Sequence, residues 1–138
     1  MNRRGLTLVE ILAVLVILGL ISATLVIGFS SKFGAAKHEL AKTSLGTVVN
    51  HLELYKVEHD LFPTNDIGIR ALTDGHATPA ATYYLSQDKI LDPWGREFQY
   101  LTPGPDGHPF ELISFGADGQ PGGDGENADI TSTNLRGS

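Results

Sequence analysis

Apolar residues follow two different patterns along the first sixty positions of the chain. From Ile11 to Ile27 the sequence contains no charged residue and is apolar on every helical face. Further on, apolar residues recur at intervals of four and three, which is the spacing of one helix face. This second pattern consists of Ala41, Leu45, Val48, Leu52 and Tyr55. We therefore predict one long helix from near Leu6 to about His59, with an apolar stem and an amphipathic half that packs on a sheet.

The polar second half of the sequence predicts short elements. Phe62 precedes a proline and is pushed out of the helical region, so the long helix ends before it. Asn65 is the expected N-cap of a short helix. Two strands joined by a proline- and glycine-rich hairpin turn are expected at Phe98–Leu101 and Phe110–Phe115, with the turn at Pro103–Gly107. The predicted fold class is α+β: a long N-terminal helix packed on a small antiparallel sheet, followed by a Gly/Asp-rich loop.

Length, charge and cysteine content narrow the class of protein. The 138 residues leave room for one small domain beyond the apolar run, and no cysteine is present to form a disulfide. A net charge of −6 argues against nucleic acid as a partner. The apolar run corresponds to about 26 Å of helix, and its extension from Leu6 to Phe29 reaches the length that spans a bilayer. Arg3 and Arg4 favour a cytoplasmic N-terminus.

The residues before the apolar run form a recognisable processing signal. A secretory leader is normally cut after its apolar stretch, at small residues. The segment from Arg3 to Glu10 instead resembles the leader of type IV pilin-like proteins, in which a prepilin peptidase cleaves after the glycine and N-methylates the next residue. The resemblance implies cleavage between Gly5 and Leu6, although the family most often has Phe at the position of Leu6. The expected parts are a leader at 1–5, a transmembrane or filament-core helix at 6–29 (the stem), and a periplasmic globular domain at 30–138.

Glu10 is the one carboxylate at the edge of the apolar run. A charge within hydrocarbon costs roughly 2.5–3.5 kcal/mol on insertion scales and therefore implies a partner. Cleavage at Gly5 would free a cationic α-amino group on Leu6. We expect Glu10 to pair with the Leu6 amine of a neighbouring subunit, and the resemblance implies the same role in setting the register of a helical filament. A position at the level of the lipid headgroups is the alternative.

Motifs beyond the leader resemble those of the major pseudopilins of type II secretion systems. They occur in the order Tyr55–Thr64, Gly68–Leu72, Asp92–Gly95 and Ser114–Gly119. The resemblance implies a structural subunit that polymerises into a periplasmic pseudopilus and helps to export folded proteins across the outer membrane. Its implied partners are copies of itself, minor pseudopilins, the prepilin peptidase and the inner-membrane secretion platform.

The C-terminal part of the chain is rich in carboxylates. No Lys or Arg occurs from Glu97 to Asn134, whereas seven acidic residues do. Carboxylates that converge on one loop repel each other unless a hard cation lies among them, and calcium accepts six to eight oxygen ligands in irregular geometry. The spacing is not that of an EF-hand. A solvated acidic loop is the simpler interpretation.

The resemblance to major pseudopilins, which bind calcium in this loop, favours a metal site. The expected side-chain ligands are Asp118, Asp124 and Asp129, with Ser114 or nearby carbonyl groups completing the shell. The choice among Asp124, Glu126 and Asn127 stays open.

Other functions have less support in the sequence. No nucleophile motif, phosphate-binding loop or zinc spacing is present, so no enzyme activity is expected. Trp94 is expected to fill the core rather than a binding site. A type IV pilin used for adhesion or motility is an alternative, although pilins commonly have two C-terminal cysteines. A secreted calcium-binding or hydrolytic protein, with an ordinary leader cut near Ser22-Ala23, is a second alternative.

Overall fold

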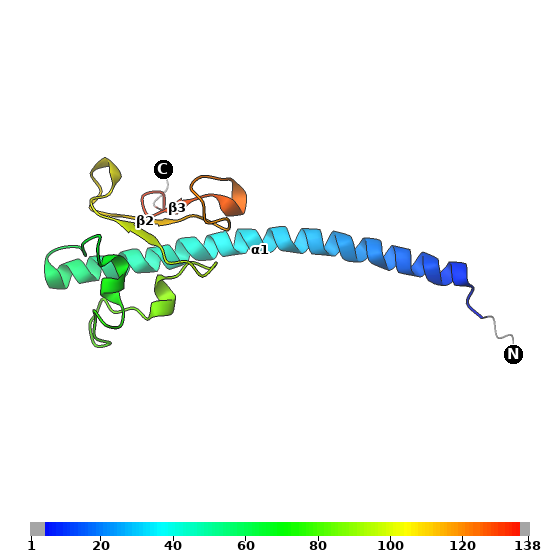
Figure 1. Ribbon diagram of the computed structural model, residues 1–138, viewed down its shortest axis with the longest axis horizontal. Coiled ribbons are helices and arrows are strands. Elements are labelled where there is room, and N and C mark those ends of the chain that lie inside the picture. The colour runs from blue at the N-terminus through cyan, green and yellow to red at the C-terminus, as the bar shows by residue number, and fades with distance from the viewer. Residues whose placement is uncertain (1–4, 136–138) are drawn as a thin grey trace. The chain divides into compact units, whose positions relative to one another are not determined.

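The computed structural model describes residues 5–135, apart from the side chains of residues 27 and 29–31. The chain divides into two compact units, Met1–Phe33 and Gly34–Ser138. Helix α1, Leu8–His59, begins in the first unit and ends in the second (Figure 1). The predicted long helix is therefore confirmed, and it continues through the glycines at 28 and 34.

The first unit consists of the apolar part of α1. Its segment Leu8–Val26 has a mean hydropathy of 2.6 and is long and apolar enough to cross a membrane. Its described side chains are exposed, since nothing within the unit covers them.

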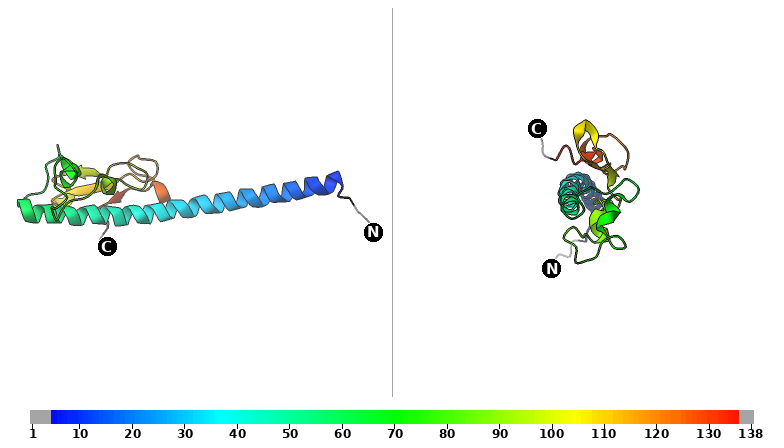
Figure 2. Two further views of the ribbon diagram at one scale, coloured as in Figure 1. Left: turned by 90° about the horizontal axis from the view of Figure 1, so that it is seen from below. Right: turned by 90° about the vertical axis from the view of Figure 1, so that its left-hand side faces the viewer.

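The second unit is built on the amphipathic part of α1. Four of the predicted stripe residues, Ala41, Leu45, Val48 and Leu52, are completely buried, and Tyr55 packs against the same core. The strands and short helical turns gather on one side of this part of the helix (Figure 2). Trp94 also packs against the core, as predicted.

A three-stranded antiparallel sheet covers the helix stripe. Strands β1 (Gln99–Leu101), β2 (Glu111–Ser114) and β3 (Ile130–Thr131) lie in the order β1-β2-β3. Tyr100 pairs with Leu112, and Ser114 with Ile130. The α+β fold and the first two strands are confirmed, whereas β3 was not predicted because two residues give no alternating pattern.

Four short 3₁₀ turns connect these elements: η1 (Gly68–Leu72), η2 (Gln87–Ile90), η3 (Pro105–Gly107) and η4 (Gly125–Asn127). The expected role of Asn65 was wrong, since η1 begins after Ile67 and has no side-chain cap. The Asn65 side chain instead holds the end of β1. Its Nδ2 donates to the Thr102 carbonyl at 2.6 Å, and its Oδ1 accepts from the Thr102 N–H at 2.8 Å.

Candidate functional site

The first predicted site lies at the start of α1. Gly5 and Leu6 are exposed and precede the helix, while Arg3 and Arg4 lie outside the described residues. The Thr7 N–H donates to Glu10 Oε2 at 2.8 Å, and the Glu10 N–H donates to Thr7 Oγ1 at 3.3 Å. This reciprocal pair is a capping box, which satisfies two N–H groups that a helix start leaves without a partner.

The capping box leaves Glu10 able to bind a further donor. An ionised carboxylate offers about four lone-pair sites on its two oxygens, and the bond from Thr7 uses one of them. Glu10 can therefore stabilise its own helix and still accept an ammonium group from another chain. Sequence reasoning missed the first of these roles, although a Thr followed three residues later by Glu is the standard pattern of a capping box.

The second predicted site, the acidic loop, is anchored by a buried aspartate before it. The side chain of Asp92 is only 2% exposed, and both of its oxygens have partners. Oδ1 accepts the backbone N–H groups of Trp94 at 3.0 Å and Arg96 at 2.9 Å, and Oδ2 accepts the Ser114 hydroxyl at 2.9 Å. The Ser114 hydroxyl, an expected calcium ligand, is therefore engaged with Asp92 rather than with a carboxylate of the loop.

Arg96 brings a positive charge to the acidic loop. Its Nη2 donates to the Gly116 carbonyl, and its Nε lies 3.9 Å from Asp92 Oδ2. The guanidinium packs so closely on Gly119 that a Cβ there would lie 2.9 Å from Arg96 Cζ. Sequence reasoning missed this contact because Arg96 comes one residue before the acidic region. Its position directly after the Asp-Pro-Trp-Gly turn was the available signal.

The three expected aspartate ligands lie on this loop but have different surroundings. Asp118 Oδ1 accepts the Gln120 N–H at 3.1 Å, and Asp129 Oδ2 accepts the Gly122 N–H at 2.8 Å. The other oxygen of Asp129, Oδ1, is buried without a hydrogen-bond partner. Asp124 immediately precedes η4. Within residues 5–135, no three Asp, Glu or His side chains form a group that could hold a metal ion.

The fit to calcium therefore depends on one carboxylate and on the backbone. An unpartnered buried oxygen such as Asp129 Oδ1 is a group for which a cation would compensate. Backbone carbonyls and water can complete a calcium shell that has fewer than three carboxylates. Glu126 also reaches α1, where a Cβ on Gly34 would overlap its carboxylate.

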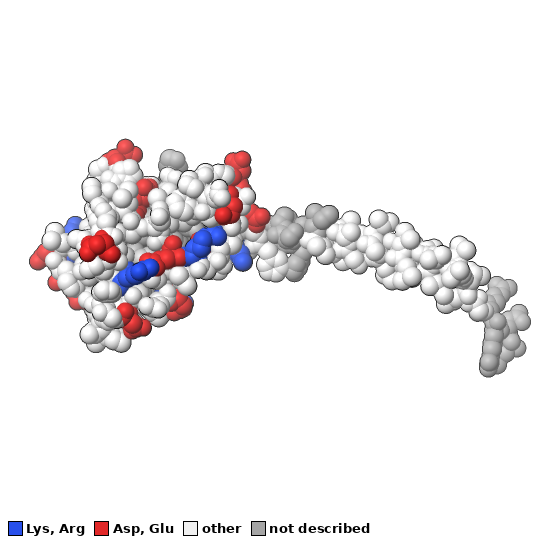
Figure 3. Space-filling model, viewed as in Figure 1, with Lys and Arg blue, Asp and Glu red and all other residues white. Residues whose placement is uncertain are grey.

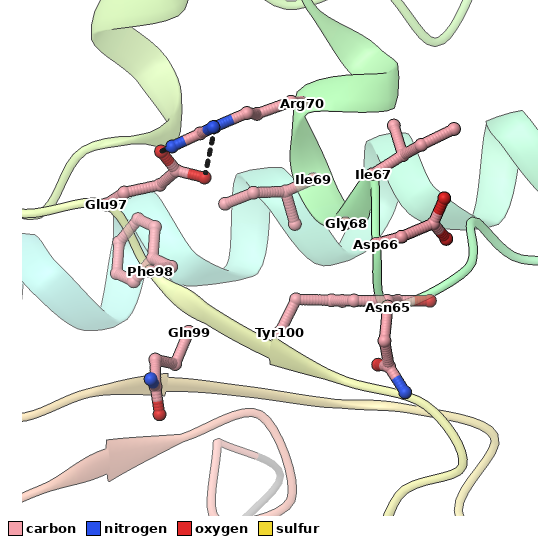
Figure 4. A pocket seen from close by; sticks show the side chains of 10 residues that line it. All are labelled: Asn65, Asp66, Ile67, Gly68, Ile69, Arg70, Glu97, Phe98, Gln99 and Tyr100. Carbon is pink, nitrogen blue, oxygen red and sulfur yellow. Dashed lines mark hydrogen bonds and ion pairs between the residues drawn. The ribbon is translucent and has the colours of Figure 1, made fainter.

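Not every acidic residue of the predicted region belongs to the loop. Acidic side chains occur in several separate groups on the face in Figure 3. Glu97 forms a two-pronged ion pair with Arg70 of η1, with Nε 3.2 Å from Oε1 and Nη2 3.0 Å from Oε2. The Glu97 carboxylate raises the pKa of Arg70 above its ordinary value. The pair lines a polar pocket of about 310 Å³ between η1 and β1 (Figure 4).

Comparison with known proteins places these features in a family. The family model for type II secretion system (T2SS) protein G matches residues 29–133, and the prokaryotic N-terminal methylation motif matches residues 1–26. The second range contains Gly5, Leu6 and Glu10.

Relatives match over most of their length. Type II secretion system core protein G of Vibrio cholerae is 35% identical and covers 98% of this chain and 94% of its own. The protein of the same name from Pseudomonas aeruginosa is 39% identical over 94% of this chain and 96% of its own. The major pseudopilin from the type 2 secretion system of enterohaemorrhagic Escherichia coli superposes with a TM-score of 0.56 and 25% identity, covering 77% of this chain and 91% of that one.

Proposed function

Since the chain belongs to the protein G family of type II secretion systems and is a pseudopilus subunit, we propose that the stem is a membrane anchor. The stem would hold the chain in the inner membrane until the subunit is assembled. The observation that carries this proposal is the family match over residues 29–133, next to a methylation motif and an apolar helical segment. This family is one of structural subunits. The match to protein G favours the secretion pseudopilus over an adhesive pilus.

Processing would convert the membrane anchor into an assembly element. The peptidase would cut between Gly5 and Leu6 and methylate Leu6, which leaves the apolar helix on the mature subunit. Two arginines before the cut favour a cytoplasmic N-terminus and hence a periplasmic second unit. The exposed apolar side chains of Leu8–Val26 need a cover, either lipid or the stems of other copies.

Glu10 would select the register in which the stems pack. When the Leu6 amine of one copy meets the carboxylate of a neighbour, each charge loses its unfavourable exposure to hydrocarbon. The capping box supports this role because it holds the carboxylate at the helix start with capacity for a second donor. Growth of such a polymer would push folded proteins outwards, with minor pseudopilins, the peptidase and the inner-membrane platform as partners.

Calcium binding by the acidic loop is the second part of the proposal. Asp129 would be the main side-chain ligand, because its Oδ1 is buried without a partner. Asp118 and Asp124 are on the same loop and would contribute charge or further oxygens. The ion would offset the negative charge of the loop and order its glycines, which supplements the contact already made by Arg96.

The mass of the mature N-terminus tests the processing and thereby the function. We expect N-methylated Leu6 as the first residue when the full chain is expressed with its peptidase, and short filaments in cells that overproduce it. Gly5→Leu should block cleavage, whereas Asn2→Ala, in the same leader, should be processed normally. A mature chain that begins after Ala23 would contradict the proposal, since the stem would then be a removed leader.

A further inference from the structure

Strand β1 is an edge strand, because the sheet order β1-β2-β3 leaves one of its sides without a neighbouring strand. Residues on either side of Tyr100 already use their outward backbone groups. Thr102 exchanges two hydrogen bonds with the Asn65 side chain, and the Phe98 N–H donates to the Ile90 carbonyl at 3.2 Å. Backbone groups of a strand point to alternate sides at successive residues. The N–H and C=O of Tyr100 therefore also point away from β2.

The pairing of β2 supports this direction. Tyr100 is opposite Leu112, whose N–H donates to Ser132 Oγ at 3.0 Å and whose C=O accepts the Ser132 N–H at 2.9 Å. Both backbone groups of Leu112 face β3, so Tyr100 and Leu112 form a pair without mutual hydrogen bonds. No hydrogen bond to the N–H or C=O of Tyr100 occurs within residues 5–135. The edge thus offers one donor and one acceptor to a partner.

Tyr100 lines the polar pocket of about 310 Å³ between η1 and β1 (Figure 4). Its ring stacks on Phe110 in the core, with 5.9 Å between the ring centroids. Asn65 lies at one end of the pocket and the Arg70–Glu97 ion pair at the other. The volume is near the lower end of the usual range of about 300–1,000 Å³ for ligand pockets, which fits a short segment rather than a long strand.

The charges of the pocket favour a basic occupant. Arg70 and Glu97 neutralise each other through their two-pronged ion pair. Asp66 also lines the pocket and forms no ion pair within the described part of the chain. The hydrogen bond from the Thr64 hydroxyl holds the pKa of Asp66 below its usual value, so this carboxylate is ionised at neutral pH. The pocket therefore has one uncompensated negative charge.

We propose that this pocket binds an extended peptide segment of another protein, with a basic side chain, as a short additional strand on β1. One residue of such a segment matches Tyr100, because its N–H and C=O can exchange two hydrogen bonds with those of Tyr100. The basic side chain of the segment would meet Asp66, the carboxylate without an ion pair. Such binding goes beyond the polymerisation proposed above and does not depend on it.

Amide spectroscopy of the full-length chain in detergent tests the contact. Labelling with ¹⁵N-tyrosine gives four tyrosine amide signals, and Tyr100→Phe identifies the signal of Tyr100 by its loss. Titration with acetyl-Val-Lys-Val-N-methylamide should shift this signal, whereas the signals of Tyr55, Tyr83 and Tyr84 should stay in place. A probe that is N-methylated at the lysine amide nitrogen lacks the donor. It should bind about three- to tenfold more weakly, as expected for the loss of one hydrogen bond.

Charge variants test the selection of a basic side chain. The probe acetyl-Val-Glu-Val-N-methylamide should bind at least about threefold more weakly than the lysine probe. Asp66→Asn should abolish this difference. Asp106→Asn is the matched control, because Asp106 is an exposed aspartate outside the pocket, and it should retain the difference.

Several outcomes would overturn the proposal. An unshifted Tyr100 signal, or equal binding of the N-methylated probe, would show that the edge of β1 does not bind peptide backbone. Equal binding of the lysine and glutamate probes would exclude selection of a basic segment. A shift of the Tyr100 signal when the chain alone is concentrated would assign the pocket to a second copy of this chain instead.

Discussion

The two halves of α1 share one backbone conformation, but their apolar side chains have opposite surroundings. In the first unit, the apolar residues between Leu8 and Val26 are exposed. In the second, Ala41, Leu45, Val48 and Leu52 are fully buried under the sheet. Helix propensity alone stabilises a helix only weakly, and most of the stability comes from packing of an apolar face. The second half therefore obtains its stability within the chain, and the first half requires lipid or other copies.

Removal of the Glu10 charge should have the largest effect, because it acts on the half that depends on external partners. Glu10→Gln keeps a residue accepted in a capping box but could not form the ion pair that we propose with Leu6 of a neighbouring copy, and a broken buried pair typically costs about 3–5 kcal/mol. We expect normal cleavage and methylation, with filament assembly lost in imaging. Glu39→Gln removes an exposed helix charge and should assemble normally. Normal filaments from Glu10→Gln would refute the pairing.

A cavity in the stripe should affect only the second half. Leu52→Ala should lower the unfolding free energy of the second unit by about 2–5 kcal/mol, because Leu52 is completely buried. Trp94 packs against the core and is the only tryptophan, so its fluorescence reports this unfolding during denaturation of the detergent-solubilised chain. Leu18→Ala removes the same atoms from an exposed stem position and should leave that transition unchanged. Equal effects of both variants would contradict the division into two units.

Patterns that depend on near neighbours in the sequence were predictable. The change from an all-apolar run to a four-and-three spacing located both halves of α1, and turn residues at Pro103–Gly107 located the first hairpin. These signals are local, since periodicity and turn chemistry involve only a few adjacent residues.

Contacts between distant segments were not predictable from such patterns. Asn65 is a residue type that favours an N-cap, but its side-chain amide instead forms hydrogen bonds with the backbone N–H and C=O of Thr102, 37 residues away. Ser114 and Arg96 both donate hydrogen bonds to Asp92, because β2 passes the turn that contains Asp92. The acidic loop is thus partly neutralised by a guanidinium that precedes it. Only the folded chain brings these residues together.

Calcium should affect the second unit through its loop and leave the stem unaffected. A ligand at one hundred times its dissociation constant stabilises the state that binds it by about 2.7 kcal/mol. We expect calcium to raise the melting temperature of the second unit and a chelator to reverse the shift. Asp129→Asn should remove most of the shift, whereas Asp106→Asn, on the hairpin turn, should retain it. A chelator without effect on the unmodified chain would refute the site.

Substitution of Asp92 tests how strongly its buried hydrogen bonds stabilise the second unit. Asp92→Asn keeps one carbonyl oxygen and replaces the other with an amide that cannot accept the Ser114 hydroxyl. The expected loss is about 1–3 kcal/mol in the unfolding free energy, which is typical of a buried group left without its partner. Asp88→Asn, at an exposed site, should change stability little. Proteolysis of the loop should also become faster in Asp92→Asn, because the Ser114 hydroxyl at the start of the loop loses its acceptor.

Alkaline pH should have the smallest effect, and it acts through the contact between the helix end and the sheet. Burial raises the pKa of Tyr100 above its ordinary value of 10.0, and its hydroxyl donates to the Pro63 carbonyl at 2.8 Å. Below pH 10 the hydroxyl is protonated in both folded and unfolded chains, so its contribution is fully present. Above that value the unfolded chain loses the proton first, and stability therefore falls as the pH rises towards the folded pKa. Tyr100→Phe should be less stable at neutral pH and should show a shallower decline above pH 10 in Trp94-monitored denaturation. If the stability of Tyr100→Phe fell above pH 10 as steeply as that of the unmodified chain, ionisation of Tyr100 would not cause the decline.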